Sequence, residues 1–272
     1  MTSRSSTRRR VRFAIVVFLL IAGASGLSAQ TIPAPVPAEG EGGLTIPFVN
    51  LEIRQPEDSQ EVALSLQLLL LLSVLTLAPS IIILLTSFLR ISIVMDFVKR
   101  ALSLQQVPPT QVLMGISLFL TLFIMWPTLT TIYDNAFVPM AEGEISIEEA
   151  YREFEAPMRL FMYRQMEANP DTIRLFMRMG NMPAPATFAD VPTQALIPAF
   201  ILHELTVAFK IGILLFIPFI IIDMVVASTL MSMGMIMLPP IMISLPFKLI
   251  VFVLVDGWTF LTQQLVASFG GF

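Results

Sequence analysis

The chain has 272 residues, of which 56% are hydrophobic and 13% are charged, and its formal net charge is −4. A soluble domain has about a quarter of its residues charged, so this composition and a mean hydropathy of +0.81 indicate a membrane protein. The absence of cysteine and the single histidine exclude disulfides, thiolate metal sites and multi-histidine metal sites. We therefore expect no metal or other cofactor, and the small net charge predicts no nucleic-acid partner.

Residues 1–29 have the three parts of a secretory signal peptide. Five arginines precede the apolar residues 13–27, and Ser28 and Ala29 supply small side chains for cleavage. The apolar part is short for a membrane span, so we favour a cleaved signal over an uncleaved anchor helix. Prolines and glycines then predict that residues 30–61 form a linker without regular structure.

The remaining chain predicts an all-α, integral-membrane-type protein of two long kinked helical hairpins. The apolar hairpins should occupy residues 62–133 and 192–272. Residues 134–191 are more polar and should form a small helical extracytoplasmic domain between them. Both hairpins have a proline in the first arm and two prolines at the tip. This fits a parallel internal repeat and, equally well, the ordinary preference of proline for turns.

The first hairpin begins with a segment long enough to cross a membrane, residues 64–89, whose helical pattern continues to residue 100. Pro79 should kink this arm because it lacks a backbone N–H. A turn at residues 101–109 should lead into a return helix over residues 110–133, with its end marked near Trp126 and Pro127. Basic side chains gather beside this turn, so the positive-inside rule predicts that the turn is cytoplasmic.

The polar segment has clear helix boundaries. Ser146 and Glu149 have the spacing of a capping box that opens a helix. Pro157 should break or restart this helix. A further helix should be capped by Asn169 and should end at Gly180.

Ionic and polar groups stand out within the apolar hairpins. Such groups are costly in lipid and usually face a protein interior or a watery cavity. We expect them to pair across helices or across subunits, because an unpaired buried charge costs several kcal/mol. The candidate residues are Arg90, His203, Glu204, Lys210, Asp223, Lys248 and Asp256.

Two functional readings of these groups stay open as alternatives. His203, Thr206 and Lys210 share one helical face, and with Glu204 they could form a proton relay of an ion-coupled transporter. We favour inter-helix or inter-subunit pairing, because a lone histidine with one acid does not outline a pathway. Asp223 and Asp256 could serve an intramembrane protease, but no motif around them supports it. The usual nucleotide, zinc-protease and serine-hydrolase motifs are absent, so we expect no enzyme.

Several motifs carry a specific resemblance. Residues 198–212, PAFILHELTVAFKIG, strongly resemble a signature of the FliP family of type III export-gate proteins, and residues 246–249, PFKL, resemble its second signature. Residues 86–91, TSFLRI, and 108–113, PPTQVL, are also similar to family motifs. The resemblance extends from about residue 64 to the C-terminus.

The resemblance implies a non-enzymatic subunit of the flagellar protein export gate. Family members form a ring, expected to contain five copies, that joins FliQ and FliR, with FlhA and FlhB alongside. Unfolded flagellar subunits pass through its centre. The implied location is the bacterial inner membrane at the flagellar basal body, with a periplasmic domain and a ring raised out of the bilayer plane. The equivalent subunit of a virulence secretion system is the nearest alternative, and the signal-like residues 1–29 favour the flagellar branch.

The methionine-rich tip of the second hairpin gains a role from the resemblance. By composition alone, its methionines fit ordinary packing of irregular gaps. In the family a methionine loop resembles a gasket around the channel, and the matching residues are Met235, Ile236 and Met237. The resemblance also implies that Glu204 and Lys210 lie at packed subunit contacts.

Overall fold

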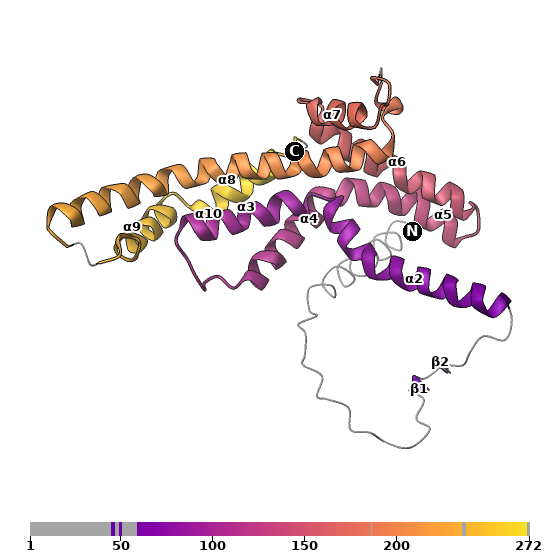
Figure 1. Cartoon of the computed structure of the whole chain (residues 1–272), viewed down its shortest axis with the longest axis horizontal. Coiled ribbons are helices and arrows are strands. Elements are labelled where there is room, and N and C mark those ends of the chain that lie inside the picture. Colours follow the sequence, from indigo (N-terminus) through magenta and orange to yellow (C-terminus); the bar gives the residue numbers. More distant parts are fainter. Residues whose placement is uncertain (1–44, 47–48, 51–58, 186, 236–237, 271–272) are drawn as a thin grey trace, which may run out of the picture. The chain divides into compact units, whose positions relative to one another are not determined.

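The computed structural model describes residues 45–46, 49–50, 59–185, 187–235 and 238–270 (Figure 1). The expected signal peptide, residues 1–29, lies outside these residues. The chain divides into two compact units, of which one is Val11–Ile81 and the other contains Ile82–Phe272. Helices make up most of the described residues, and three are long and apolar enough to cross a membrane, which confirms an all-α membrane protein.

The smaller unit contains a short strand pair and most of an apolar helix. Strands β1 (Thr45–Ile46) and β2 (Val49–Asn50) pair antiparallel, so the expectation of no regular structure across the linker is wrong at these residues. Their β-branched side chains favour extended backbone. Helix α2 (Ser59–Leu84) continues through Pro79, and its leucines are exposed. A helix that is apolar all round is typical of a membrane span.

The helical pattern does not continue unbroken to residue 100, because α2 ends at Leu84 and α3 (Phe88–Ala101) begins four residues later. Thr86 lies in the gap, where its hydroxyl donates to the carbonyl of Ile83 at 3.2 Å and accepts the N–H of Phe88 at 3.4 Å. A threonine hydroxyl competes in this way with backbone hydrogen bonds, which explains the interruption.

The return helix is longer than expected. Helix α4 (Thr110–Ile132) passes through Pro127 and continues as the π-helix η1 (Tyr133–Phe137) and α5 (Val138–Ala141). The expected range of residues 110–133 agrees with α4 to within one residue, whereas the end expected near Pro127 is wrong. Membrane helices tolerate proline where hydroxyl side chains and local π-helical adjustment satisfy backbone groups. Here the hydroxyls of Thr130 and Thr131 both donate to the Pro127 carbonyl.

Helices α6 (Ile147–Met166) and α7 (Asp171–Met179) and the 3-10 turn η2 (Phe188–Asp190) follow. The capping box is confirmed, since Ser146 and Glu149 exchange side-chain and backbone hydrogen bonds. The predicted break at Pro157 is wrong. Buried methionines along one face of α6 hold the helix together, because tertiary packing outweighs a local breaker. The Asn169 side chain accepts the N–H of Asp171 at 3.3 Å, and Gly180 follows the last residue of α7.

The second hairpin consists of α8 (Thr193–Ser232), α9 (Pro240–Leu254) and α10 (Gly257–Ala267). Figure 1 shows α8 as the long orange helix with α9 returning along it. The 40 residues of α8 span about 60 Å, roughly twice the thickness of the hydrocarbon core of a bilayer.

The return arm is not one helix, because α9 and α10 meet at a bend of 65°. Asp256 takes a left-handed conformation there, with φ of 50°. A Cβ on Gly257 would lie 2.3 Å from the Phe252 ring, so a larger residue there would require the ring to shift.

Helix α3 packs closely on α8. A Cβ on Gly212 would lie 2.5 Å from the ring of Phe97, which shows how closely this α3 side chain packs on the backbone of α8. The Phe97 ring meets those of Phe209 and Phe216 edge to face, with centroids 5.3 and 5.9 Å away. The packing leaves another face of α8 exposed and apolar, including Ile213.

Candidate functional site

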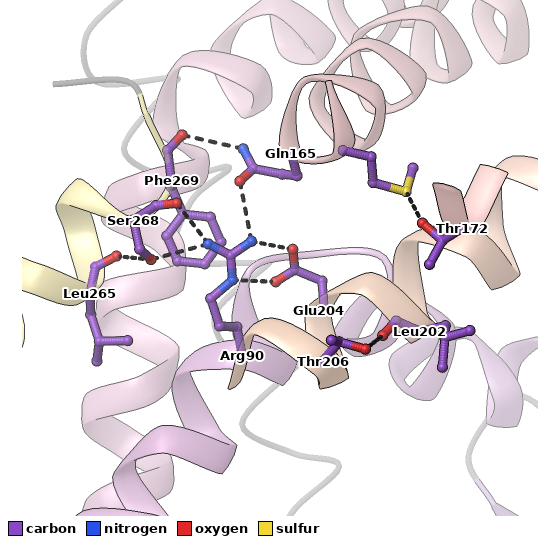
Figure 2. Close-up of polar contacts among 10 residues, drawn as sticks. Arg90, Gln165, Thr172, Leu202, Glu204, Thr206, Leu265, Ser268 and Phe269 are labelled. Carbon is purple, nitrogen blue, oxygen red and sulfur yellow. Dashed lines mark hydrogen bonds and ion pairs between the residues drawn. The ribbon is translucent and has the colours of Figure 1, made fainter. Parts of the chain in front are cut away.

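The guanidinium of Arg90 forms the centre of a buried polar network. Arg90 comes from α3, and Glu204 comes from the buried face of α8. The Nε of Arg90 donates to Oε2 of Glu204 at 2.8 Å, and its Nη2 donates to Oε1 of the same carboxylate. Figure 2 shows this two-pronged contact, the strongest geometry for an arginine–carboxylate pair.

The other donors of Arg90 bind two further segments. Nη1 donates to the carbonyl of Ser268 at 2.8 Å and to its hydroxyl at 3.1 Å, and Nη2 donates to Oε1 of Gln165 at 3.3 Å. The Gln165 amide donates in turn to the carbonyl of Phe269 (Figure 2). The centroid of the Phe269 ring lies 3.9 Å from the guanidinium carbon of Arg90. Arginine has five N–H donors, and Arg90 makes five hydrogen bonds.

This network connects α3, α6, α8 and the segment just after α10 through one side chain. A buried charge whose donors are all engaged is stable in place, but the loss of one partner leaves an uncompensated charge. The carboxylate of Glu204 is committed to Arg90 on both oxygens. The arrangement therefore supports a structural role for Glu204 rather than a place in a proton relay.

A second ion pair joins α8 and α9 to the end of α3. Lys248 is buried, and its Nζ donates to Oδ2 of Asp223 at 2.7 Å, to the hydroxyl of Ser103 at 2.8 Å and to the carbonyl of Ala101 at 3.2 Å. Ala101 is the last residue of α3, so the ammonium satisfies a carbonyl that the helix leaves open. The hydroxyl of Ser244 donates to the other oxygen of Asp223 at 2.5 Å.

Four of the predicted polar residues thus have partners on other helices of the same chain. The structure brings Arg90 to Glu204 and Asp223 to Lys248, and it does not unite these pairs in one cluster with the other candidates. The implied placement of Glu204 at a subunit contact does not match its complete burial within the chain.

The other three candidates lie nearer the surface. His203 is half-buried, whereas Lys210 and Asp256 are exposed. Thr206, expected on the same face as His203, donates its hydroxyl to the carbonyl of Leu202 at 2.8 Å (Figure 2).

The methionine tip is described in part. Helix α8 ends at Ser232, and Gly234 has a φ of 76°, a conformation that favours glycine. Met235 is exposed, as are other tip methionines. Ile236 and Met237 lie outside the described residues.

Sequence reasoning missed the uncharged members of both networks. Gln165, Ser268, Ser103 and Ser244 have no pattern that marks them, because each contacts residues far away along the chain. Arg159 was also missed. It donates to the carbonyl of Val191 at 2.6 Å and so ties α6 to the start of α8. Buried ionic groups require partners, and that requirement alone predicts only that such neighbours exist.

Comparison with known proteins identifies the family. The FliP family profile matches residues 71–265. The chain is 66% identical over 224 residues to the flagellar biosynthetic protein FliP of Treponema denticola, covering 82% of this chain and 83% of that protein. It is 58% identical to the protein of that name from Borreliella burgdorferi, over 84% of this chain and 89% of the relative. For Bacillus subtilis FliP the identity is 49%, with coverages of 82% and 99%. The chain therefore belongs to the FliP family.

Proposed function

We propose that this FliP-family protein is a channel-forming core subunit of the flagellar type III export gate, conducting unfolded flagellar subunits across the inner membrane. It works as a homo-oligomer, a ring of five copies by family expectation, together with FliQ and FliR and beside FlhA and FlhB. It performs no covalent chemistry. Family membership over residues 71–265 and the three membrane-length helices support the export role.

The observation that carries the channel proposal is the division of α8 into two faces. One face of α8 packs within the chain, where Glu204 binds Arg90 and Gly212 contacts the ring of Phe97. The opposite face is apolar and exposed along a helix about twice as long as a bilayer core. Lipid cannot cover all of such a face, so protein partners must cover part of it.

The tip of the second hairpin supplies the proposed seal. Met231, Met233 and Met235 are exposed around the turn between α8 and α9. Flexible, polarisable methionine side chains can close around polypeptides of varied sequence. In the proposal, Met235, Ile236 and Met237 of each copy meet at the centre of the ring as a gasket.

The organisation of the chain in the membrane belongs to the same proposal. Residues 1–29 act as a signal peptide and residues 30–61 as a linker, while residues 62–133 and 192–272 form the two hairpins. Residues 134–191 then lie in the periplasm. The charged surface of α6, with exposed Glu148 and Arg152, supports an aqueous location for this segment.

Gene deletion tests the export role. A strain without this gene should form no filaments and should export no hook protein, and the wild-type gene should restore both. Normal filaments in the deletion strain would reject the proposal. Purified protein that moved protons across liposomes without partners would favour the stand-alone transporter instead.

The gasket has its own test. A Met235→Ala, Met237→Ala double variant should make membranes leaky to small solutes, because alanine leaves gaps where methionine closes them. Uptake of a membrane-impermeant dye would be measured in cells that produce the assembled gate. A Met179→Ala variant, changed at an exposed methionine on α7, is the control. Unchanged permeability of the double variant would count against the gasket.

A further inference from the structure

Two charged side chains lie on exposed apolar surfaces without an ionic partner. Within the described part of the chain, neither Lys210 nor Asp256 takes part in an ion pair, although Arg90–Glu204 and Asp223–Lys248 do. The two side chains have opposite charges and come from different elements, the middle of α8 and the junction of α9 with α10.

Lys210 stands in the centre of the exposed face of α8. Its neighbours on this face lie three, four or seven residues away along the helix and are all exposed. They are Thr206, Ile213, Leu214 and Ile217. An ammonium in an apolar face is costly in lipid unless it finds a partner or reaches the headgroups.

Asp256 is exposed at the bend between α9 and α10. Its neighbours Leu254 and Val255 have 79% and 61% of their surface exposed. The carboxylate does not cap α10, although its position precedes that helix. Asp256 has a left-handed backbone conformation, with φ of 50°, and the Phe252 ring packs against the next residue, Gly257.

The register of α8 and α9 places the two charges at similar levels. Lys248 contacts Asp223, and the ring of Phe252 lies 6.5 Å from that of Phe219. The second contact is four residues further along α9 and four residues back along α8, as antiparallel helices require. Extending this register places Asp256 level with position 215. That position is five residues, or about 7.5 Å along the axis, from Lys210.

We propose that Lys210 of one copy forms an ion pair with Asp256 of the neighbouring copy in the ring. In a ring around an axis along the long helices, residues at similar levels on adjacent copies meet. The contact joins two different surfaces of the chain, and such head-to-tail contacts form a ring when the rotation from copy to copy closes. The pair would neutralise both charges and would set the axial register of the copies. This inference rests on the proposed homo-oligomeric gate and names one contact within it.

Cysteine cross-linking tests the contact directly, because the natural chain contains no cysteine. A Lys210→Cys, Asp256→Cys double variant would be produced with its gate partners and oxidised in membranes. Non-reducing electrophoresis should then show a ladder of dimers, trimers and larger species. Either single variant should give no ladder above the dimer. A Lys210→Cys, Glu148→Cys variant, which pairs the same lysine position with an exposed site on α6, is the matched control.

The outcomes separate this inference from the proposed function. Native size would be measured in detergent alongside the ladder. Oligomers that form without a ladder would overturn the Lys210–Asp256 contact and leave the ring proposal standing. A disulfide confined to single chains would also overturn it. Absence of any oligomer from wild-type protein produced with its gate partners would instead reject the homo-oligomeric gate.

Charge reversal gives a second readout. Lys210→Asp or Asp256→Lys alone should lower the oligomeric fraction about tenfold or more, because like charges meet at the contact. The double reversal should restore it. If Lys210 bound only lipid headgroups, Lys210→Asp would be harmful whatever residue stood at position 256. Failure of the double reversal to restore assembly would therefore overturn the pairing.

Discussion

The two buried ion pairs differ in how completely the protein encloses them. Arg90 and Glu204 are both excluded from solvent, and all five donors of the arginine are engaged. In the second pair Lys248 is equally buried, but the side chain of Asp223 keeps 31% of its surface exposed. Water can therefore stabilise Asp223 if its partner is lost. The first pair therefore fixes the packing of the helices. The second pair joins α8 to α9, and the protein should tolerate its loss better.

Removing Glu204 should have the largest effect. A Glu204→Ala variant leaves Arg90 charged and buried, which should lower the free energy of unfolding by about 3–5 kcal/mol. Limited proteolysis and thermal unfolding of the purified gate would measure the loss. An Arg90→Met, Glu204→Leu double variant should recover part of the stability, because it removes both buried charges. A single variant as stable as the wild type would contradict the enclosed-pair interpretation.

Removing the carboxylate of the second pair should cost less. Asp223→Asn keeps the shape of the side chain and its contact with Ser244, while Lys248 retains Ser103 and Ala101 as acceptors. The expected loss is about 1–3 kcal/mol, typical of a buried donor group deprived of one partner. The same unfolding assay applies. If this variant proved less stable than Glu204→Ala, the ranking of the two pairs would be wrong.

The close contact between α3 and α8 sharpens the comparison, because it lies between the two pairs on α8. Gly212→Ala would place a methyl group against the Phe97 ring. The overpacking should exceed the gain in helix propensity and leave a net loss of about 1 kcal/mol. A Phe97→Leu, Gly212→Ala double variant should be less destabilised than the sum of the two single variants. Strict additivity would show that the ring does not limit the approach of the helices.

A helix cap outside the apolar hairpins provides the smallest expected effect. Ser146→Ala removes a capping hydroxyl from the start of α6 and should cost about 1 kcal/mol or less. Unfolding of the variant at neutral pH would be compared with that of the wild type. An effect as large as that of Asp223→Asn would mean that the exposed cap matters as much as a buried pair.

The same cap predicts a pH dependence. Hydrogen bonds from the backbone N–H and the side chain of Ser146 lower the pKa of Glu149 below its usual value. The stabilisation is therefore present above the usual glutamate pKa and is lost as the pH falls through the lowered pKa of the folded state. In Glu149→Gln this part of the acid dependence should disappear. If the loss of stability at low pH were the same in Glu149→Gln as in the wild type, Glu149 would not contribute to it.

The class of fold and the identity of the ionic residues could be read from the sequence, because apolar length and isolated charges are local signals. Proline positions misled at Pro127 and Pro157, where the helix continues through the proline because tertiary packing outweighs a local breaker. The bend at Asp256 depends on the Phe252 ring, which approaches only in the folded chain. The partners of Arg90 come from three segments, α6, α8 and the residues after α10, and no spacing rule predicts such long-range contacts.

Cross-linking to a stalled export substrate would test the channel role most directly. A Met235→Cys variant in the otherwise cysteine-free chain would be combined with a substrate that carries a folded plug and a single cysteine in its unfolded part. The account predicts a disulfide between the substrate and position 235 and none between the substrate and a cysteine placed at Glu148. A substrate that remains stalled in the gate, bonds to a partner subunit and never reaches position 235 would contradict it.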